Sequence, residues 1–259
     1  MALTLDLEGR TAVVTGGVRG VGAGISRAFL EAGADVVAVA RREPESLPEA
    51  NGRTARFVSL DARDADAAQA FADGLERVDV LVNNAGGGPF LPLTDGALRT
   101  HVKIIELNLT SALIMSRVLQ PRMLEGGGGS VVNIGSVSGV RPSPGTSAYG
   151  AAKAGLHSLT RSLAVEWAPH VRVNTLVLGM IRTETAHLHY GDEEGIAAVG
   201  RTVPMGRLGT PDEVGAACVY LASDLAAYVT GTEMLLHGGG ERPAFLDAAT
   251  ANKDEKESR

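Results

Sequence analysis

Short apolar runs alternate with helical segments along most of this chain of 259 residues. The runs are almost continuously apolar and rich in valine, which is typical of strands buried on both faces of a parallel sheet. The predicted strands are residues 11–15, 35–40, 55–60, 78–83, 130–134, 171–178 and 232–236. The predicted helices are residues 25–33, 67–76, 97–124, 147–168 and 211–223. Because strand and helix alternate throughout, we predict an α/β fold with a doubly wound, seven-stranded parallel sheet and helices on both faces.

No linker, internal repeat or second apolar core divides the sequence. We therefore predict one domain over residues 1–249, followed by a charged tail at 250–259 that we expect to be disordered. Residues 182–208 show no strand pattern, and a connection of this length in a compact domain is often a lid over a functional site. We call residues 182–208 the lid.

The connection from the first predicted strand to the first predicted helix is rich in glycine. Gly16, Gly20 and Gly22 follow the spacing G-x-x-x-G-x-G, with Val21 between the last two. Glycines at such a junction let a diphosphate approach the free N–H groups of the helix N-terminus, where the helix dipole also favours an anion. Glycine-rich turns also arise from steric need alone. Their position at the start of an α/β chain favours a dinucleotide site that includes Val21.

The end of the second predicted strand indicates which dinucleotide binds. An NAD site usually places a carboxylate there for the ribose hydroxyls, but this chain has Ala40 followed by Arg41 and Arg42. Arg41, with Arg19 from the glycine turn, could hold a 2′-phosphate through paired charge-assisted hydrogen bonds. The alternative is that these arginines are solvated loop charges. We predict NADP(H) as the cofactor rather than NAD(H).

Tyr149 and Lys153 lie four positions apart in the sequence YGAAK, within small residues that favour a helix. Residues i and i+4 share a helix face, so the phenol and the ammonium are predicted to point to one place. A phenol there could exchange a proton with an alkoxide. We expect the ammonium, together with the nicotinamide cation of an oxidised complex, to lower the pKa of this phenol below the usual value of about 10. Either residue alone could equally be a core-edge tyrosine or a solvated lysine.

Three motifs together resemble those of the short-chain dehydrogenase/reductase family: TGxxxGxG at 15–22, NNAG at 83–86 and YxxxK at 149–153. The resemblance covers about residues 9–240. It implies a Rossmann-type fold and an oxidoreductase that interconverts a ketone and a secondary alcohol by hydride transfer with a nicotinamide cofactor. Matched position by position, it implies four catalytic residues: Tyr149 as acid/base, Lys153 as its partner, Ser136 as the hydroxyl that orients the substrate, and Asn108 as the support of a water chain to the lysine.

The resemblance also implies contacts to the cofactor, including contacts from Tyr149 and Lys153. The further positions are Asp61 and Ala62 at the adenine, Asn83, Ala85 and Gly86 at the adenine ribose and the sheet edge, and Ile181 and Thr183 at the nicotinamide carboxamide.

Substrate class is predicted from the residues expected around the reacting group. Apolar positions such as Phe90, Val137 and Tyr190 favour an apolar alicyclic or steroid-like ketone, or a 3-oxoacyl-CoA. Relatives that act on acyl carrier protein carry arginines near the site entrance, where this chain has Gly127 and His170. A 3-oxoacyl-[acyl-carrier-protein] reductase remains an alternative. A non-catalytic dinucleotide sensor on the same fold is another, although sensors commonly lose the tyrosine or the lysine.

Composition excludes several other classes of protein. The formal net charge of −6 argues against nucleic-acid binding, which needs a basic surface. The N-terminus lacks the basic and apolar regions of a signal peptide, and no segment reaches the roughly 20 apolar residues of a membrane span, so we expect a cytoplasmic protein. The single cysteine, Cys218, lies in an apolar run and is predicted to be a buried structural thiol. We predict no metal site, and the family resemblance implies a homotetramer or homodimer.

Overall fold

The computed structural model describes residues 5–249, and the predicted tail at 250–259 lies outside this range. Within it, seven parallel strands form one sheet in the order β5-β2-β1-β6-β7-β8-β9. The strands are β1 (Thr11–Thr15), β2 (Asp35–Ala40), β5 (Arg56–Ser59), β6 (Val80–Asn83), β7 (Gly129–Ser136), β8 (Val171–Leu178) and β9 (Glu233–Leu236). The predicted fold class, including all seven strands, is therefore confirmed.

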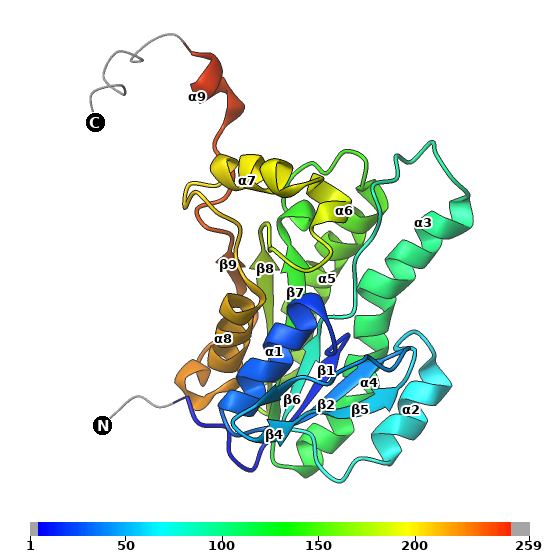
Figure 1. Cartoon of the computed structure of the whole chain (residues 1–259). Coiled ribbons are helices and arrows are strands. Elements are labelled where there is room, and N and C mark those ends of the chain that lie inside the picture. Colours follow the sequence, from blue (N-terminus) through cyan, green and yellow to red (C-terminus); the bar gives the residue numbers. More distant parts are fainter. Residues whose placement is uncertain (1–4, 250–259) are drawn as a thin grey trace.

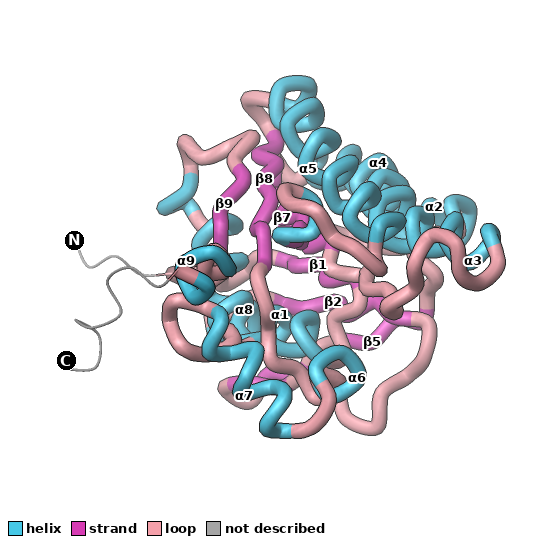
Figure 2. Tube along the Cα trace, turned by 90° about the horizontal axis from the view of Figure 1, so that it is seen from above, coloured by secondary structure: helices cyan, strands magenta, loops and turns pink. Residues whose placement is uncertain are grey.

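Helices cover both faces of the sheet (Figure 1; Figure 2). One apolar core lies between the sheet and helices α1 (Gly20–Glu31) and α8 (Pro211–Ala222). A second core lies on the opposite face, beneath α2 (Ala65–Asp73), α4 (Ser111–Glu125) and α5 (Ser147–Trp167). Two packed cores on one sheet explain why the strands read as continuous apolar runs.

The strand order reverses between β1 and β6, because the chain leaves β1 toward β2 and later returns on the other side to β6. In an open parallel sheet, ligands bind outside the carboxyl ends of the strands at such a reversal. The glycine turn follows β1, and the NNAG motif starts in β6. The topology therefore brings these two motifs together at one edge.

Helix α1 is held tightly against α8 by two glycines. A Cβ atom at Gly24 would lie 2.5 Å from the Pro211 side chain, and one at Gly215 would lie 2.6 Å from the Cβ of Ala28. Only glycine permits such close approach of the helix backbones. The packing fixes the direction in which the start of α1 points.

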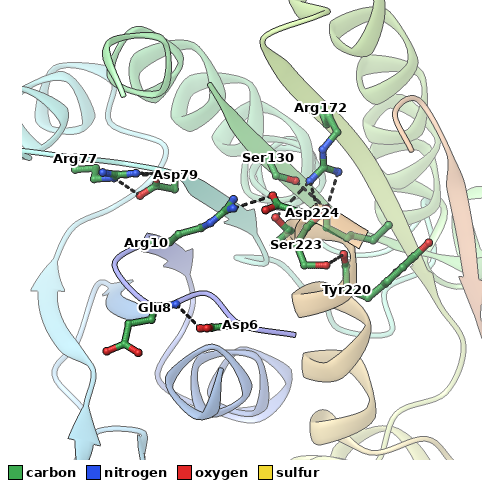
Figure 3. A network of polar contacts seen from close by, with 12 residues as sticks. Asp6, Glu8, Arg10, Arg77, Asp79, Ser130, Arg172, Tyr220, Ser223 and Asp224 are labelled. Carbon is green, nitrogen blue, oxygen red and sulfur yellow. Dashed lines mark hydrogen bonds and ion pairs between the residues drawn. The ribbon is translucent and has the colours of Figure 1, made fainter. Parts of the chain in front are cut away.

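The amino edge of the sheet is tied together by polar contacts (Figure 3). Arg172 donates to the Leu221 carbonyl at the end of α8 at 2.7 Å, and Arg10 pairs with Asp224 at 2.7 Å. Asp79, paired with Arg77, accepts from the backbone N–H of Thr11 at 2.8 Å. These contacts join the starts of several strands, on the edge opposite the candidate site, so we interpret them as structural.

Several elements differ from the sequence-based prediction. The predicted helix at 97–124 consists of α3 (Leu98–Ile105), a π-helical turn (Glu106–Thr110) and α4. The lid contains two helices, α6 (His187–Tyr190) and α7 (Glu193–Thr202). Other small elements were not predicted: β3 (Glu49–Ala50), β4 (Arg53–Thr54), α9 (Ala244–Ala248) and the 3₁₀ turns Val137–Gly139 and Asp224–Ala226. Among the described residues, no helix combines the length and apolar character needed to span a membrane.

Candidate active site

Ser136, Tyr149 and Lys153 come together at the carboxyl end of β7. Ser136 is the last residue of that strand, and Tyr149 and Lys153 occupy the first two turns of α5. The Nζ atom of Lys153 lies 5.6 Å from the centroid of the Tyr149 ring and donates to the Ile134 carbonyl at 2.8 Å. The shared helix face predicted from the sequence is therefore confirmed, and the lysine is almost fully buried.

Burial dominates the electrostatics of this pair. It raises the pKa of Tyr149, while a hydrogen bond with the Ser136 side chain lowers that pKa by a smaller amount. Burial also lowers the pKa of Lys153 to about 8. Among the protein's own groups, burial therefore has the largest effect on the pKa of Tyr149, because desolvation disfavours the charged form. The lowering of this pKa in the oxidised complex stays a prediction.

Asn108 is buried in the π-helical turn and joins that turn to the segment after β6. Its Nδ2 atom donates to the carbonyls of Ile104 and Gly87, and its Oδ1 atom accepts from the Gly87 N–H, each at 2.8 Å. A Cβ atom at Gly86 would lie 2.6 Å from Asn108 Oδ1 and 3.3 Å from Lys153 Nζ. Gly86 therefore lies close to both Asn108 and Lys153. Single π-helical turns are frequent at functional sites.

The glycine turn is shaped by contacts that exclude side chains. Gly16 has a φ of 64°, and a Cβ atom at Gly22 would lie 2.0 Å from the Gly16 carbonyl oxygen. Asn84, which the sequence analysis did not select, supports this turn by donating from Nδ2 to the Thr15 carbonyl at 2.9 Å. Asn84 could have been found from the sequence, because it lies inside NNAG beside Asn83 and Ala85, which are predicted cofactor contacts. A glycine turn of this shape leads directly into the N-terminus of α1, where free N–H groups favour an anion, so its residues fit the diphosphate of a dinucleotide.

Two residues of the NNAG motif, Asn83 and Ala85, face different parts of the molecule. Asn83 is buried, and its Nδ2 atom donates to Ser116 Oγ at 2.9 Å and to Asn133 Oδ1 at 2.8 Å. Its side chain is thus part of a polar network in the core, and only its main chain can border a ribose. Ala85 lies at the glycine turn, where its backbone N–H donates to Thr15 Oγ1 at 3.0 Å.

Three charged side chains that the sequence predicts at the cofactor differ in their partners. Arg19 and Arg41 are exposed, and neither has an ion pair among the described residues. Asp61, next to the buried Ala62, is paired with Arg63 at 2.6 Å, and this contact lowers the pKa of Asp61 to about 2. The Asp61 carboxylate is therefore held in place by a neighbour that the sequence analysis did not consider.

The lid approaches the same edge of the sheet. Ile181 is half-buried and pairs with Gly209 through a short parallel bridge. Thr183 lies beside Gly20, because a Cβ atom at that glycine would be 3.6 Å from Thr183 Cγ2. The structure thus places Thr183 against the glycine turn.

A charged pair lies near the predicted apolar pocket. Arg141, before α5, forms an ion pair with Glu241 from the segment after β9. Both side chains influence the pKa of Tyr190, which burial raises most strongly, and Tyr190 in turn slightly raises the pKa of Tyr149. The surroundings of Tyr190 therefore include a charged pair that sequence patterns did not indicate, since its members are 100 residues apart.

Gly127 and His170 do not lie near Tyr149 in this chain. The His170 carbonyl accepts from the Gly129 N–H at 3.1 Å, where β7 begins. The expectation that these positions report on the site entrance is therefore wrong: they lie at the amino edge of the sheet, whereas Ser136 lies at the carboxyl end of β7.

His157 was also missed by the sequence analysis. It follows Lys153 by one helical turn on α5, is 2% exposed, and has its Nδ1 atom 3.4 Å from Glu233 Oε2. A Cβ atom at Gly135 would lie 2.4 Å from His157 Nε2. The imidazole therefore packs directly beneath the strand end that carries Ser136. Burial lowers its pKa, which favours the neutral ring.

Other reactive groups are not gathered into a second site in the part of the chain that the structure describes. Cys218 is fully buried, and burial raises the pKa of its thiol, as expected for a structural cysteine. Residues 5–249 contain no group of three or more Cys, His, Asp or Glu side chains that could hold a metal ion.

The chain is similar to many known oxidoreductases. A family model described as enoyl-(acyl carrier protein) reductase matches residues 16–241. D-threitol dehydrogenase from Mycolicibacterium smegmatis is 36% identical over 243 residues, which cover 90% of this chain and 93% of that protein. The 3-oxoacyl-[acyl-carrier-protein] reductase of Vibrio harveyi is 36% identical over 248 residues, with coverages of 91% and 98%. The NADP active-site complex of Pseudomonas aeruginosa RhlG superposes with a TM-score of 0.82 at 32% identity, covering 92% of this chain and 99% of that one.

Proposed function

This chain belongs to the short-chain dehydrogenase/reductase family, and from that membership we propose that it interconverts a ketone and a secondary alcohol with NADP(H). Members of this family are oxidoreductases that use NAD(P). The finer assignments of cofactor and substrate come from the residues of this chain.

The observation that carries the proposal is the arrangement around Tyr149. Its phenol contacts Ser136, and Lys153 lies 5.6 Å from its ring, at the sheet edge where the glycine turn starts α1. A non-catalytic sensor would have no need of a buried phenol, hydroxyl and lysine at that edge.

We assign the roles as follows. The nicotinamide would supply or accept the hydride when bound. Ser136 would hold the substrate oxygen by a hydrogen bond, a preorganised contact to a developing negative charge. Tyr149 would donate the proton to that oxygen in reduction, and its raised pKa keeps the phenol protonated at neutral pH. Lys153 would hold the nicotinamide ribose, and Asn108, bonded to Gly87, would support a water chain that leads to the lysine.

The preference for NADP(H) is proposed from charge. Arg19 and Arg41 are exposed and have no ion pair among residues 5–249, whereas many other arginines of the chain are paired with carboxylates. Two exposed guanidinium groups without an ion pair in the described range, one in the glycine turn after β1 and one directly after β2, are suited to a phosphate. RhlG, a structural neighbour at 32% identity, is solved with NADP.

The double variant Arg41→Asp with Arg19→Ala tests this assignment. We expect its Kd for NADPH to rise roughly tenfold to a hundredfold, because two charge-assisted contacts to the 2′-phosphate are lost. Fluorescence titration with NADPH and with NADH measures the effect. The Kd for NADH serves as the internal control and should stay within about twofold. An unaltered preference for NADPH would overturn the assignment.

For the substrate, we propose an apolar alicyclic or steroid-like ketone, or a 3-oxoacyl-CoA, on the basis of the apolar residues Phe90, Val137 and Tyr190, which the sequence predicts around the reacting group. A second candidate is a polyhydroxylated substrate. The Arg141–Glu241 pair, whose side chains are 40% and 38% exposed, could bind hydroxyl groups. D-threitol dehydrogenase, at 36% identity, acts on such a compound by its name.

Turnover measured with the Tyr149→Phe variant tests the function. Wild-type protein is assayed by loss of NADPH absorbance with a panel of alicyclic and steroid ketones, 3-oxoacyl-CoA, 3-oxoacyl-acyl carrier protein and keto sugars. For any substrate accepted, we expect the variant to lose at least about a hundredfold in kcat, because the proton donor is removed. Its Kd for NADPH should be unchanged. Retained activity in the variant would refute the role of Tyr149, and wild type inert on all substrates would favour a sensor.

A further inference from the structure

The start of α1 is contacted by a carboxylate from the lid. The backbone N–H of Gly20, the first residue of α1, donates to Glu184 Oε1 at 2.9 Å. The two residues are 164 positions apart, and the lid lies beside the start of α1 in both views of the chain (Figure 1; Figure 2).

The contact stabilises the N-terminus of helix α1. The first N–H groups of a helix have no partners within it, and a negative charge is favoured there. Helix α1 has no acidic residue in its first turn, and the side chain of its N-cap residue, Arg19, makes no capping hydrogen bond. Glu184 therefore supplies the anion that the sequence around α1 does not.

The fit extends beyond one hydrogen bond. A Cβ atom at Gly20 would lie 3.7 Å and 3.9 Å from the two carboxylate oxygens of Glu184, and 3.6 Å from Thr183 Cγ2. Residues 183 and 184 thus lie in van der Waals range of the glycine turn. The carboxylate of Glu184 forms no ion pair with any residue in the described range, and the nearby Arg182 is paired with Glu193 at 2.7 Å.

The same N–H groups are where the proposed function places the cofactor diphosphate, so the following inference rests on that function. A carboxylate and a diphosphate repel each other and require the same donors. We propose that Glu184 is an internal competitor of the cofactor. Its carboxylate holds the lid on the start of α1, the diphosphate displaces it, and cofactor binding is thereby coupled to movement of the lid.

The charge-neutral variant Glu184→Gln tests the competition. It keeps the size of the side chain and an acceptor oxygen but removes the charge that repels the diphosphate. We expect its Kd for NADPH to fall roughly two- to tenfold, the range for one charge at a helix N-terminus. The control is Glu194→Gln, a lid carboxylate in α7 without an ion pair among the described residues, which changes the net charge equally. Its Kd should match that of wild type.

A second readout does not depend on affinity. In the protein without cofactor, the Gly20 amide should exchange its hydrogen slowly in wild type and faster in Glu184→Ala, because the acceptor is lost. Added NADPH should protect this amide in both proteins and should increase exchange across residues 183–190 in wild type only.

The outcomes distinguish failure of the Glu184 competition from failure of the proposed function. Wild type that binds neither NADPH nor NADH overturns both. If wild type binds NADPH as tightly as Glu184→Gln, or more tightly, the competition is refuted while the proposed function stands. Unchanged Gly20 exchange in Glu184→Ala also refutes it.

Discussion

The pKa values of individual residues in the site depend more on burial than on the charges of neighbouring groups. The phenol of Tyr149 and the amine of Lys153 both have pKa values displaced toward the neutral form. For Tyr149 this favours the proton donor needed to reduce a ketone. For Lys153 it means that an ammonium group at pH 7 is held in the interior at a cost to folding.

Replacing this buried lysine is expected to stabilise the protein while abolishing turnover. Lys153→Met should raise the free energy of unfolding at pH 7 by about 1–3 kcal/mol, because a buried charge is replaced by an apolar chain of similar length. The pKa of Lys153 is about 8 in the folded protein, below 10.5 for an ordinary lysine. Between these values the unfolded chain binds more protons, so wild type gains stability as the pH rises from 8 toward 10.5.

The methionine variant has no such titration, so its advantage should be largest at pH 7 and should shrink above pH 8. Chemical denaturation across this pH range measures it. The matched control is Lys103→Met on α3, an exposed lysine, which should change little. A Lys153→Met protein less stable than wild type at every pH would contradict the prediction.

At the scale of elements, the outward faces of α4 and α5 are partly apolar. Leu113 on α4 is 48% exposed and Val165 on α5 is 81% exposed. Exposed apolar side chains on the outward faces of helices are typical of subunit interfaces. The family resemblance implies a homotetramer or homodimer. We therefore expect a homotetramer, or a homodimer as its half.

Light scattering after size exclusion tests the assembly. The wild-type mass should be two or four times the chain mass of 26.7 kDa. Val165→Glu should shift it toward the monomer, because a charge is costly in an apolar interface. Leu93→Glu, a similar change at an exposed position before α3, should leave the mass unaltered. Monomeric wild type would refute the interface.

The elements themselves were predictable to different degrees. Strands such as β1, β2 and β8 have the predicted bounds, because continuous valine-rich runs are a local signal. The π-helical turn was not predictable, since it coincides with bonds from Asn108 to Gly87, a residue in another segment. The lid helices α6 and α7 were missed because they are short and their apolar residues are few.

At the scale of the whole molecule, the two edges of the sheet have separate roles. The carboxyl edge holds the glycine turn, Ser136 and Tyr149, and the amino edge holds the Arg10, Arg77 and Arg172 contacts (Figure 3). Gly127 and His170 lie at the amino edge, so their identities do not indicate which substrate enters this chain's own site at the carboxyl edge.

The sequence alone determined the fold class, the glycine turn and the shared face of Tyr149 and Lys153, because strand periodicity, glycine spacing and helical spacing are local properties of the chain. The tertiary structure decided which distant groups meet: Glu184 with Gly20, Arg141 with Glu241, and His157 with Gly135. It also decided that burial, rather than the lysine, governs the pKa of Tyr149. Desolvation depends on everything packed around a group, and no spacing along a chain encodes that.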